Sequence, residues 1–276
     1  MSDTLQRLKS FLLPLAQKGA ALAFSGGVDS SLLLAVLAQM HRELPFPFLV
    51  LNVVSSLQSA GDEEAVRKAE KDFCTKIYRL ECDPLALDPV RNNDPLRCYH
   101  CKKMLFETMI AFARERGIEN LIEGTHGDDL HAYRPGRRAL EELKVISPLA
   151  LLGISKKEVR AMASELGLQT AARPASPCLA TRFDYGTLLT EKKLQQVAAG
   201  EKLLRGFLPP DADLRLRVQE KQCRIETNPG FFSTLLEHRE EIVEKLKKAG
   251  FEKVTLDLAG FVSGGYDAKL KGMKDV

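Results

Sequence analysis

The amino-acid sequence predicts an α/β protein built on a doubly wound parallel sheet, followed by a smaller C-terminal α+β domain. Between about residues 20 and 170, short apolar runs alternate with longer amphipathic segments, which is typical of the strands and helices of a parallel sheet. This rhythm changes after a Pro- and Ala-rich stretch at 171–177. With 276 residues, of which 45% are hydrophobic and 28% charged, the chain is long enough to bury a full core.

The first domain is expected to span residues 1–184 and to begin with an amphipathic helix. Its strands are predicted at Ala20–Phe24, Phe48–Val54, Lys76–Leu80, Asn120–Glu123 and Lys144–Ser147. Its further helices are predicted at Ser30–Met40, Asp62–Phe73, Lys102–Arg116 and Ser155–Leu166. Ser155 and Glu158 have the spacing of a capping box, and Gly117 and Gly167 stand just after helices, where glycine is common.

The second domain is expected to span residues 185–276 and to serve substrate binding or oligomerisation. Its helices are predicted at Glu191–Phe207 and Pro229–Ala249. Its strands are predicted at Leu214–Gln219, Cys223–Thr227 and Lys253–Leu258, with a tight turn between the first two.

Composition and charge exclude several classes of protein. No apolar run reaches the roughly 20 residues of a membrane-spanning helix, and the N-terminus lacks the apolar stretch of a signal peptide, so a cytoplasmic protein is expected. Lys and Arg number 40 against 37 Asp and Glu, a balance that argues against a nucleic-acid partner. Six cysteines are too few for a disulfide scaffold, and in a reducing compartment closely spaced cysteines indicate metal or redox chemistry.

The segment SGGVDS, from Ser25 to Ser30, directly follows the first predicted strand and opens the first helix. Gly26 and Gly27 let the backbone turn and present N–H groups to an anion, to which the helix N-terminus adds partial positive charge. The two serine hydroxyls can donate hydrogen bonds, and Asp29 can hold Mg²⁺ against phosphate oxygens. This context favours a phosphate-binding loop over an ordinary tight turn.

The chain contains neither GxxxxGK[ST] nor GxGxxG, the signatures of Walker-type NTPases and dinucleotide-binding folds. SGGVDS instead resembles the pyrophosphate loop (PP-loop) of the ATP pyrophosphatase superfamily, whose fold is adenine nucleotide α-hydrolase-like. The resemblance implies an enzyme that splits ATP into AMP and pyrophosphate, adenylates an oxygen of its substrate and lets a nucleophile displace AMP. Members use ammonia or sulfur, so the loop alone leaves the nucleophile open.

A second motif, EGTHGDD at 123–129, follows a predicted strand, at the edge where open α/β sheets bind ligands. It resembles the GTNxDD segment that lines the ATP site of the superfamily. Asp128 and Asp129 either complete a Mg²⁺ site with Asp29 or cap the following turn. Besides the loop, the expected nucleotide contacts are Asn52, Gly124 and Thr125.

Cys98 and Cys101 form a CxxC, and Cys178 stands in the segment PCLATR. A CxxC fits half of a zinc site, a redox pair, or two of three ligands of an iron–sulfur cluster, whose open iron could hold an extra sulfide. Arg182 stands four residues after Cys178, and a nearby guanidinium favours a thiolate nucleophile. A loop cysteine without a role is the alternative for Cys178. Buried positions are expected for the remaining cysteines, Cys74, Cys82 and Cys223.

Four segments together resemble one branch of the superfamily: SGGVDS, EGTHGDD, YRPG at 133–136 and PCLATRF at 177–183. That branch is the pyridinium-3,5-biscarboxylic acid mononucleotide sulfurtransferase (LarE) family, which helps to make the nickel-pincer cofactor of lactate racemase. The resemblance implies that ATP, with Mg²⁺, adenylates each carboxylate of the pyridinium mononucleotide and that a sulfur nucleophile displaces AMP to give a thiocarboxylate. It also implies a homo-oligomer.

The resemblance implies two routes for the sulfur. In some members the cysteine of the CLAxR segment gives up its own sulfur and becomes dehydroalanine. Others resemble three-cysteine tRNA thiolases, in which a [4Fe–4S] cluster carries the transferred sulfide. Because sacrifice of Cys178 does not require a CxxC, we hypothesise that Cys98, Cys101 and Cys178 share a [4Fe–4S] cluster, with sacrifice of Cys178 as the alternative.

A substrate with a phosphate and two carboxylates needs cations around it. Arg182 and, in the YRPG segment, Arg134 are candidates. Arg215 and Arg217 alternate along a predicted strand, so both side chains point to one face and fit a phosphate clamp. A solvated edge strand guarded by charges is the alternative.

Other functions remain open at this point. A tRNA thiolation enzyme would share the loop and the cysteines, but it should carry an RNA-binding domain or a broad basic surface with stacking aromatics. Here the aromatic content is 7%, Trp is absent and the net charge is +3. An ammonia-dependent amide synthetase would have no use for Cys178. A non-catalytic nucleotide sensor would have no use for a nucleophilic cysteine at all.

Overall fold

The structure, a computed structural model, describes residues 2–131, 135–172, 174 and 177–262. It divides into two units. The first contains Met1–Ser55, Gly61–Val90 and Pro95–Ala175, and the second contains Ser56–Ala60, Arg91–Asp94 and Ser176–Val276. The boundary between domains that the sequence suggests after residue 184 stays a prediction.

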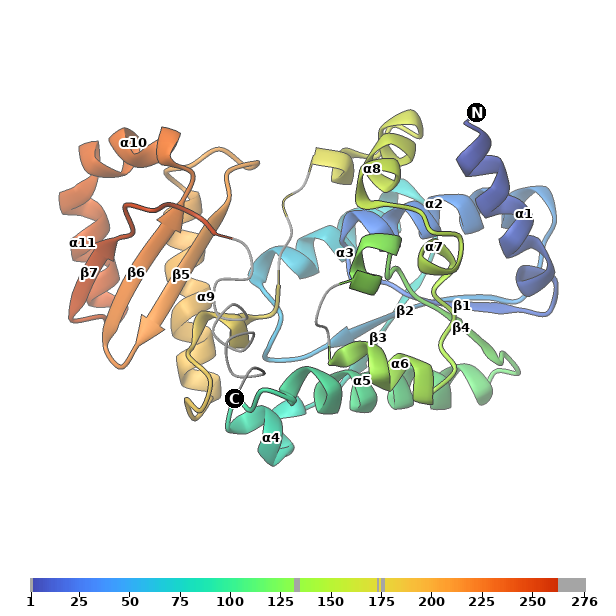
Figure 1. The fold of residues 1–276 in the computed structure, drawn as a ribbon, viewed down its shortest axis with the longest axis horizontal. Coiled ribbons are helices and arrows are strands. Elements are labelled where there is room, and N and C mark those ends of the chain that lie inside the picture. Colours follow the sequence, from blue (N-terminus) through green and yellow to red (C-terminus); the bar gives the residue numbers. More distant parts are fainter. Residues whose placement is uncertain (1, 132–134, 173, 175–176, 263–276) are drawn as a thin grey trace. The chain divides into compact units, whose positions relative to one another are not determined.

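The sheet of the first unit has the strand order β3-β2-β1-β4, with parallel pairing throughout (Figure 1). In this register Ala20 of β1 lies opposite Phe48 of β2 and Asn120 of β4. The carboxyl end of β1 therefore lies between the ends of two neighbouring strands. The predicted parallel α/β fold is confirmed. The strands are β1 (Ala20–Ala23), β2 (Phe48–Val54), β3 (Ile77–Glu81) and β4 (Asn120–Ile122).

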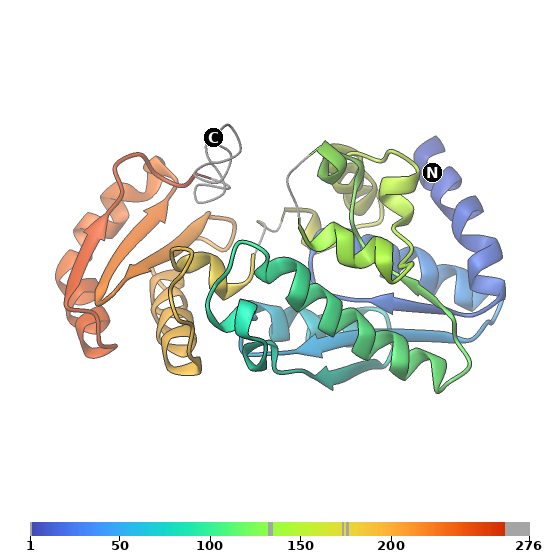
Figure 2. The same ribbon diagram turned by 60° about the horizontal axis from the view of Figure 1, so that its bottom comes forward.

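Both faces of this sheet are covered, which explains why β1 is apolar on every residue. Leu22 packs into one core with residues of α1, α2, α3 and α8, whereas Ala21 packs into another with residues of α5 and α6 (Figure 2). The helices of this unit are α1 (Asp3–Gln17), α2 (Val28–Glu43), α3 (Ala60–Asp72), α4 (Asp88–Arg91), α5 (Arg97–Arg114), α6 (Gly136–Glu142), α7 (Pro148–Leu151) and α8 (Lys156–Glu165).

Two elements that the sequence predicts in this unit differ from the structure. The strand predicted at Lys144–Ser147 is only a single bridge, between Ile146 and Ile122, because Lys144 has a φ of +55° and Pro148 already begins α7. The helix predicted from Lys102 begins at Arg97 instead, so the CxxC lies inside its first turn rather than before it.

The second unit confirms the smaller α+β domain. Its strands are β5 (Leu214–Gln219), β6 (Gln222–Thr227) and β7 (Lys253–Leu256), in the order β5-β6-β7. β5 and β6 are antiparallel, and β7 runs parallel to β6. The helices are α9 (Glu191–Arg205), α10 (Phe232–Glu237) and α11 (Arg239–Lys248).

Two contacts show what packs against β5 in this unit. A Cβ on Gly200 of α9 would lie 2.5 Å from Leu216 Cδ2, so α9 packs closely on the face of β5 that carries Leu216. A parallel bridge between Phe183 and Val218 places the segment that follows Cys178 beside β5.

Candidate active site

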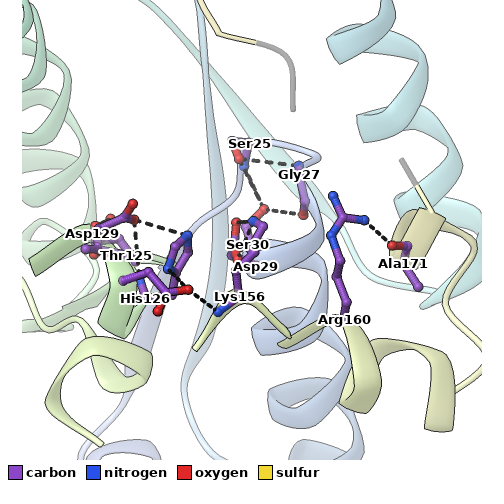
Figure 3. Close-up of polar contacts among 12 residues, drawn as sticks. Ser25, Gly27, Asp29, Ser30, Thr125, His126, Asp129, Lys156, Arg160 and Ala171 are labelled. Atoms are coloured by element: carbon purple, nitrogen blue, oxygen red, sulfur yellow. Dashed lines mark hydrogen bonds and ion pairs between the residues drawn. The ribbon is translucent and has the colours of Figure 1, made fainter. Parts of the chain in front are cut away.

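The first candidate site lies where β1 ends and α2 begins (Figure 3). Gly26 has a φ of +77°, in the left-handed region that favours glycine, and Gly27 is the N-cap of α2 without a side-chain cap. Ser25 Oγ and Ser30 Oγ lie 3.2 Å apart, and Ser30 Oγ donates to Gly27 O over 3.1 Å. The hydroxyls thus hold the loop around a helix N-terminus, where the helix dipole favours an anion.

Asp29, in the first turn of α2, is paired with Lys156. The Lys156 Nζ lies 2.8 Å from Asp29 Oδ1 and 2.6 Å from Oδ2. Lys156 is also the first residue of α8, and its backbone N–H donates to Asp128 Oδ2 over 2.8 Å. Two carboxylates therefore meet at the start of α8, one on the ammonium and one on the helix N-terminus. Asp128 thus contacts the start of a helix that is distant in sequence, whereas the two roles that the sequence left open for it were a Mg²⁺ ligand and a cap on the turn that directly follows.

Asp129 faces a buried histidine in the same segment (Figure 3). His126 is 9% exposed, and its Nε2 lies 3.4 Å from Asp129 Oδ2. The backbone N–H of His126 donates to the same oxygen over 3.4 Å, and its Nδ1 lies 3.8 Å from Asp128 Oδ2. The imidazole thus lies between the two carboxylates of the DD pair.

Gly124, just after β4, fits against the start of α2. A Cβ on Gly124 would lie 2.9 Å from Asp29 Cβ and 3.1 Å from Ser30 N. The neighbouring Glu123 is buried and accepts hydrogen bonds from Thr125 N over 2.9 Å and from Thr125 Oγ1 over 2.8 Å. The Glu123 carboxylate therefore stabilises the turn after β4, and Gly124 in that turn lies against the start of α2.

We expect Gly124→Ala to weaken ATP binding about tenfold or more with secondary structure unchanged. The added methyl would meet Asp29 Cβ and a backbone nitrogen rather than the end of a flexible side chain, so the start of α2 must shift. Titration calorimetry with a non-hydrolysable ATP analogue measures the effect. Gly230→Ala is the matched control, because nothing lies within 4 Å of the added atom. Equal affinities in the two variants would contradict the expectation.

Asn52 supports the loop from the neighbouring strand. It is buried on β2, and its Nδ2 donates to the carbonyl of Phe24, the residue before the loop, over 2.8 Å. Phe24 N in turn donates to Leu51 O over 2.7 Å. A contact between Asn52 and adenine stays a prediction.

The CxxC cysteines share one helix face. Cys98 and Cys101 are three residues apart near the start of α5, and both are of intermediate exposure. Thiolates on one helix turn are a donor set that suits iron or zinc. Among the described residues, no group of three His, Cys, Asp or Glu side chains is arranged to hold a metal ion.

The remaining cysteines only partly follow the prediction that they are buried. Cys223 is buried, and desolvation raises the pKa of its thiol to about 12. Cys82 is partly buried, and its Sγ donates to Thr108 Oγ1 over 3.3 Å. For Cys74 the prediction is wrong: the residue is exposed, because it follows α3 with a φ of +49° as the chain turns away from the helix.

In the second unit, Cys178 precedes the short 3₁₀ helix Leu179–Arg182. Arg182 is 3% exposed and pairs with Glu201 of α9 through both oxygens, at 2.8 and 2.9 Å. Its Nη1 also donates to Pro177 O over 2.7 Å. One guanidinium therefore ties the backbone beside Cys178 to α9.

Arg217 of β5 makes a second buried ion pair. Its Nε lies 3.1 and 3.2 Å from the two oxygens of Glu226, and these side chains are 5% and 6% exposed. Arg217 also donates to the carbonyl of Thr181, and Arg224 contacts Glu226 at 3.1 Å. The Arg217 guanidinium thus links β5 to β6 and to the 3₁₀ helix Leu179–Arg182.

Arg215 has no such carboxylate partner among the described residues. It is 5% exposed, its guanidinium lies 4.7 Å from the ring centroid of Phe261, and its Nε has no hydrogen-bond partner among those residues. Burial, together with the charges of Arg217 and Arg182, lowers the pKa of Arg215 to about 10. A buried cation without a counter-ion is costly, so this position favours an anionic ligand. Arg134, the other predicted substrate contact, lies outside the described residues.

A family model described as a PP-loop domain matches residues 1–172. The chain belongs to the PP-loop family of ATP pyrophosphatases. The match includes the β1–α2 loop, the segment at 123–129 and α8. The PP-loop assignment makes this an ATP-binding enzyme, as the sequence predicted. Over the described part of the chain, no helix has the length and apolar character needed to cross a membrane.

Two curated relatives match most of the chain, and a third matches about two thirds of it. An uncharacterized protein of Synechocystis is 36% identical over 270 residues, covering 96% of this chain and 97% of the relative. The pyridinium-3,5-bisthiocarboxylic acid mononucleotide synthase of Lactiplantibacillus plantarum is 35% identical over 245 residues, covering 88% and 86%. A tRNA-specific 2-thiouridylase of Rhizobium rhizogenes is 26% identical over 220 residues, covering 65% and 55%.

In this PP-loop enzyme, the sequence analysis did not identify the side chains that pair with the predicted site residues. Lys156 stands beside Ser155 in a capping box, and nothing in that local pattern indicates a partner 127 residues away. His126 carried a visible signal, because it occupies the position of Asn in GTNxDD. Glu201 and Glu226 gave none, since carboxylates on a helix and a strand are ordinary surface residues until the fold buries them.

Proposed function

We propose that this PP-loop enzyme converts the carboxylates of pyridinium-3,5-biscarboxylic acid mononucleotide into thiocarboxylates for nickel-pincer cofactor synthesis. The identity of 35% over most of the Lactiplantibacillus synthase supports this substrate. The observation that carries the proposal is the placement of Cys178, which precedes a 3₁₀ helix whose Arg182 belongs to a buried guanidinium cluster. A sulfur nucleophile and a site for an anion are thereby combined in one unit.

In the first half-reaction, a carboxylate oxygen of the substrate attacks the α-phosphorus of ATP, and the bond to the bridging oxygen breaks. Pyrophosphate leaves with that electron pair, and an acyl adenylate forms. Backbone N–H groups and hydroxyls of the loop are proposed to hold the departing phosphates at the start of α2. The proposed nucleotide contacts are Ser25, Gly26, Gly27, Asp29, Ser30, Asn52, Gly124 and Thr125.

Asp29, Asp128 and Asp129 offer the carboxylate oxygens that Mg²⁺ prefers. The pair between Asp29 and Lys156 supports the fit, because it shows that this carboxylate already faces a cation. We propose that Asp29 exchanges the ammonium for Mg²⁺ when ATP enters, which leaves Lys156 available to a phosphate oxygen. The ion, when bound, supplies neutralisation of phosphate charge.

The substrate phosphate is proposed to bind beside Arg215. Arg182 and Arg217 already have carboxylate partners, so we assign them a structural role beside the site. Arg215 has no carboxylate partner among the described residues, so its guanidinium is the one proposed to bind the phosphate. Arg134 is proposed to contribute from the YRPG segment. The C-terminal domain, placed at residues 185–276, would hold the substrate, and sedimentation would test the proposed homo-oligomer.

Two routes for sulfur follow the adenylation. In the route we favour, Cys98 and Cys101 join Cys178 as thiolate ligands of a [4Fe–4S] cluster, a group that supplies an exchangeable sulfide when bound. In the alternative route, the Cys178 thiolate attacks the acyl carbon and displaces AMP. Loss of the Cα proton then breaks the Cβ–Sγ bond, which leaves the sulfur on the product and dehydroalanine at position 178.

Anaerobic purification, with iron and acid-labile sulfide assayed beside the intact mass before and after turnover, tests the function and the route together. About four irons per chain, lost in Cys98→Ala, together with thiocarboxylate product, support the cluster route. No iron and a loss of about 34 Da at Cys178 after reaction with ATP and substrate support sacrifice. If the protein shows neither iron nor the mass loss at Cys178, that outcome would contradict sulfur transfer and return the amide synthetase to consideration.

The similarity to a tRNA-specific 2-thiouridylase favours tRNA thiolation as the second candidate. That relative is matched over only 55% of its length, and a net charge of +3 does not favour a nucleic-acid partner. A gel-shift assay with total tRNA discriminates the two. Binding of tRNA at submicromolar concentration, without turnover of the pyridinium substrate, would reverse the order of the candidates.

A further inference from the structure

The start of α5 is helical although its sequence argues against it. The N-cap is Leu96, which makes no side-chain cap, and no acidic residue stands in the first turn. Arg97, the first residue of α5, instead places positive charge at the positive end of the helix dipole, which is unfavourable. A first turn without a side-chain cap gains little stability from its own sequence, so contacts from outside α5 help to hold the turn that carries the CxxC.

Tyr99, one of the two residues between the cysteines, is anchored to α6. The Tyr99 hydroxyl donates to Glu142 Oε2 over 2.8 Å, and Glu142 is the last residue of α6. Lys103 Nζ contacts the same oxygen at 3.2 Å, and Arg138 Nε donates to Oε1 over 2.8 Å. The Arg138 guanidinium also lies 4.9 Å from the centroid of the Tyr99 ring. Both oxygens of one carboxylate are thus engaged, two of the donors coming from α5.

The Glu142 carboxylate is expected to stay ionised at neutral pH. Its hydrogen bonds, the one from Tyr99 first, lower the pKa of Glu142 to about 2. A single half-exposed ion pair contributes little, but three donors converge here on one acceptor and join two helices.

The other end of α6 touches the same turn. A Cβ on Gly136 would lie 3.3 Å from the carbonyl oxygen of Cys98 and 2.7 Å from Lys102 Cδ. α6 lies along α5 in both ribbon views (Figures 1 and 2). The backbone of α6 therefore meets the CxxC turn at its first residue, and a carboxylate meets it at its last.

We propose that α6 positions the CxxC, with Glu142 acting as a positioning residue through Tyr99. By holding the first turn of α5 in helical geometry, the contact keeps Cys98 and Cys101 on one face, as two ligands of one group require. The use of the two thiols rests on the proposed function, but their placement by α6 does not.

Glu142→Gln and Tyr99→Phe test this proposal in the full-length apo protein. We expect amide exchange in peptides covering residues 98–103, and alkylation of Cys98 and Cys101 by iodoacetamide, to quicken about fivefold or more, with Cys74 unchanged. The double variant should match Glu142→Gln, because the contact that Tyr99→Phe removes is one of those already weakened by the loss of the carboxylate. Glu141→Gln is the matched control, since Glu141 pairs only with Arg137 of its own helix among the described residues.

A second readout separates this proposal from the cluster. If the wild-type protein holds iron, Glu142→Gln should lose it to a chelator several-fold faster than Glu141→Gln. If the wild-type protein holds no iron, the cluster route fails, but the alkylation rates still decide the positioning. Exchange and alkylation rates in Glu142→Gln and Tyr99→Phe equal to those in Glu141→Gln would overturn the proposal.

Discussion

Cys178→Ser is expected to lower thiocarboxylate formation about a thousandfold or more while adenylation continues. Both sulfur routes need the Cys178 thiolate, either as a ligand or as the nucleophile, whereas ATP binds at the PP-loop in the other unit. The product is measured by mass spectrometry, and adenylation is measured as substrate-dependent exchange of labelled pyrophosphate into ATP.

Cys74→Ser is the control for this experiment, because Cys74 is exposed and distant in sequence from every proposed site residue. Cys98→Ser then separates the routes. It should match Cys178→Ser if the three thiols share a cluster, and it should retain a single turnover if Cys178 is sacrificed. Thiocarboxylate formation at the wild-type rate in Cys178→Ser would contradict the proposed chemistry.

Arg215→Met is expected to weaken binding of the pyridinium mononucleotide about a hundredfold without lowering the melting temperature. A guanidinium that faces a phosphate in a buried site contributes about 2–3 kcal/mol to binding, which corresponds to that factor. In the unliganded protein the same cation is buried without a carboxylate partner among the described residues, so replacing it with an apolar side chain of similar length removes a cost. Titration calorimetry and scanning calorimetry measure the two effects.

Arg217→Met provides the contrast on the same strand. It would leave Glu226 buried without its main partner, and breaking such a pair costs about 3–5 kcal/mol, less whatever Arg224 recovers. Its melting temperature should therefore fall by several degrees. If Arg215→Met is destabilised to the same extent, Arg215 is a structural residue and the anion site is misplaced.

The elements that the sequence predicted well are those with a local cause. The loop after β1 follows from two glycines at a strand end, and the alternation of Arg215 and Arg217 follows from the two-residue period of a strand. The start of α5 could not be predicted in this way, because its first turn is held by Glu142 of a different helix. The pairing of Asp29 with Lys156 depends on where α8 docks, which no local pattern encodes.

If Asp29 binds Mg²⁺ as proposed, its ion pair with Lys156 also links the binding of the metal and the nucleotide thermodynamically. Magnesium alone must displace an ammonium from Asp29, and that ammonium then lacks a counter-ion unless a phosphate is present. Conversely, a nucleotide that draws Lys156 away leaves Asp29 open to a metal. Under this proposal each ligand raises the affinity for the other by the same factor, and we expect the loop to prefer the metal–nucleotide complex to either component.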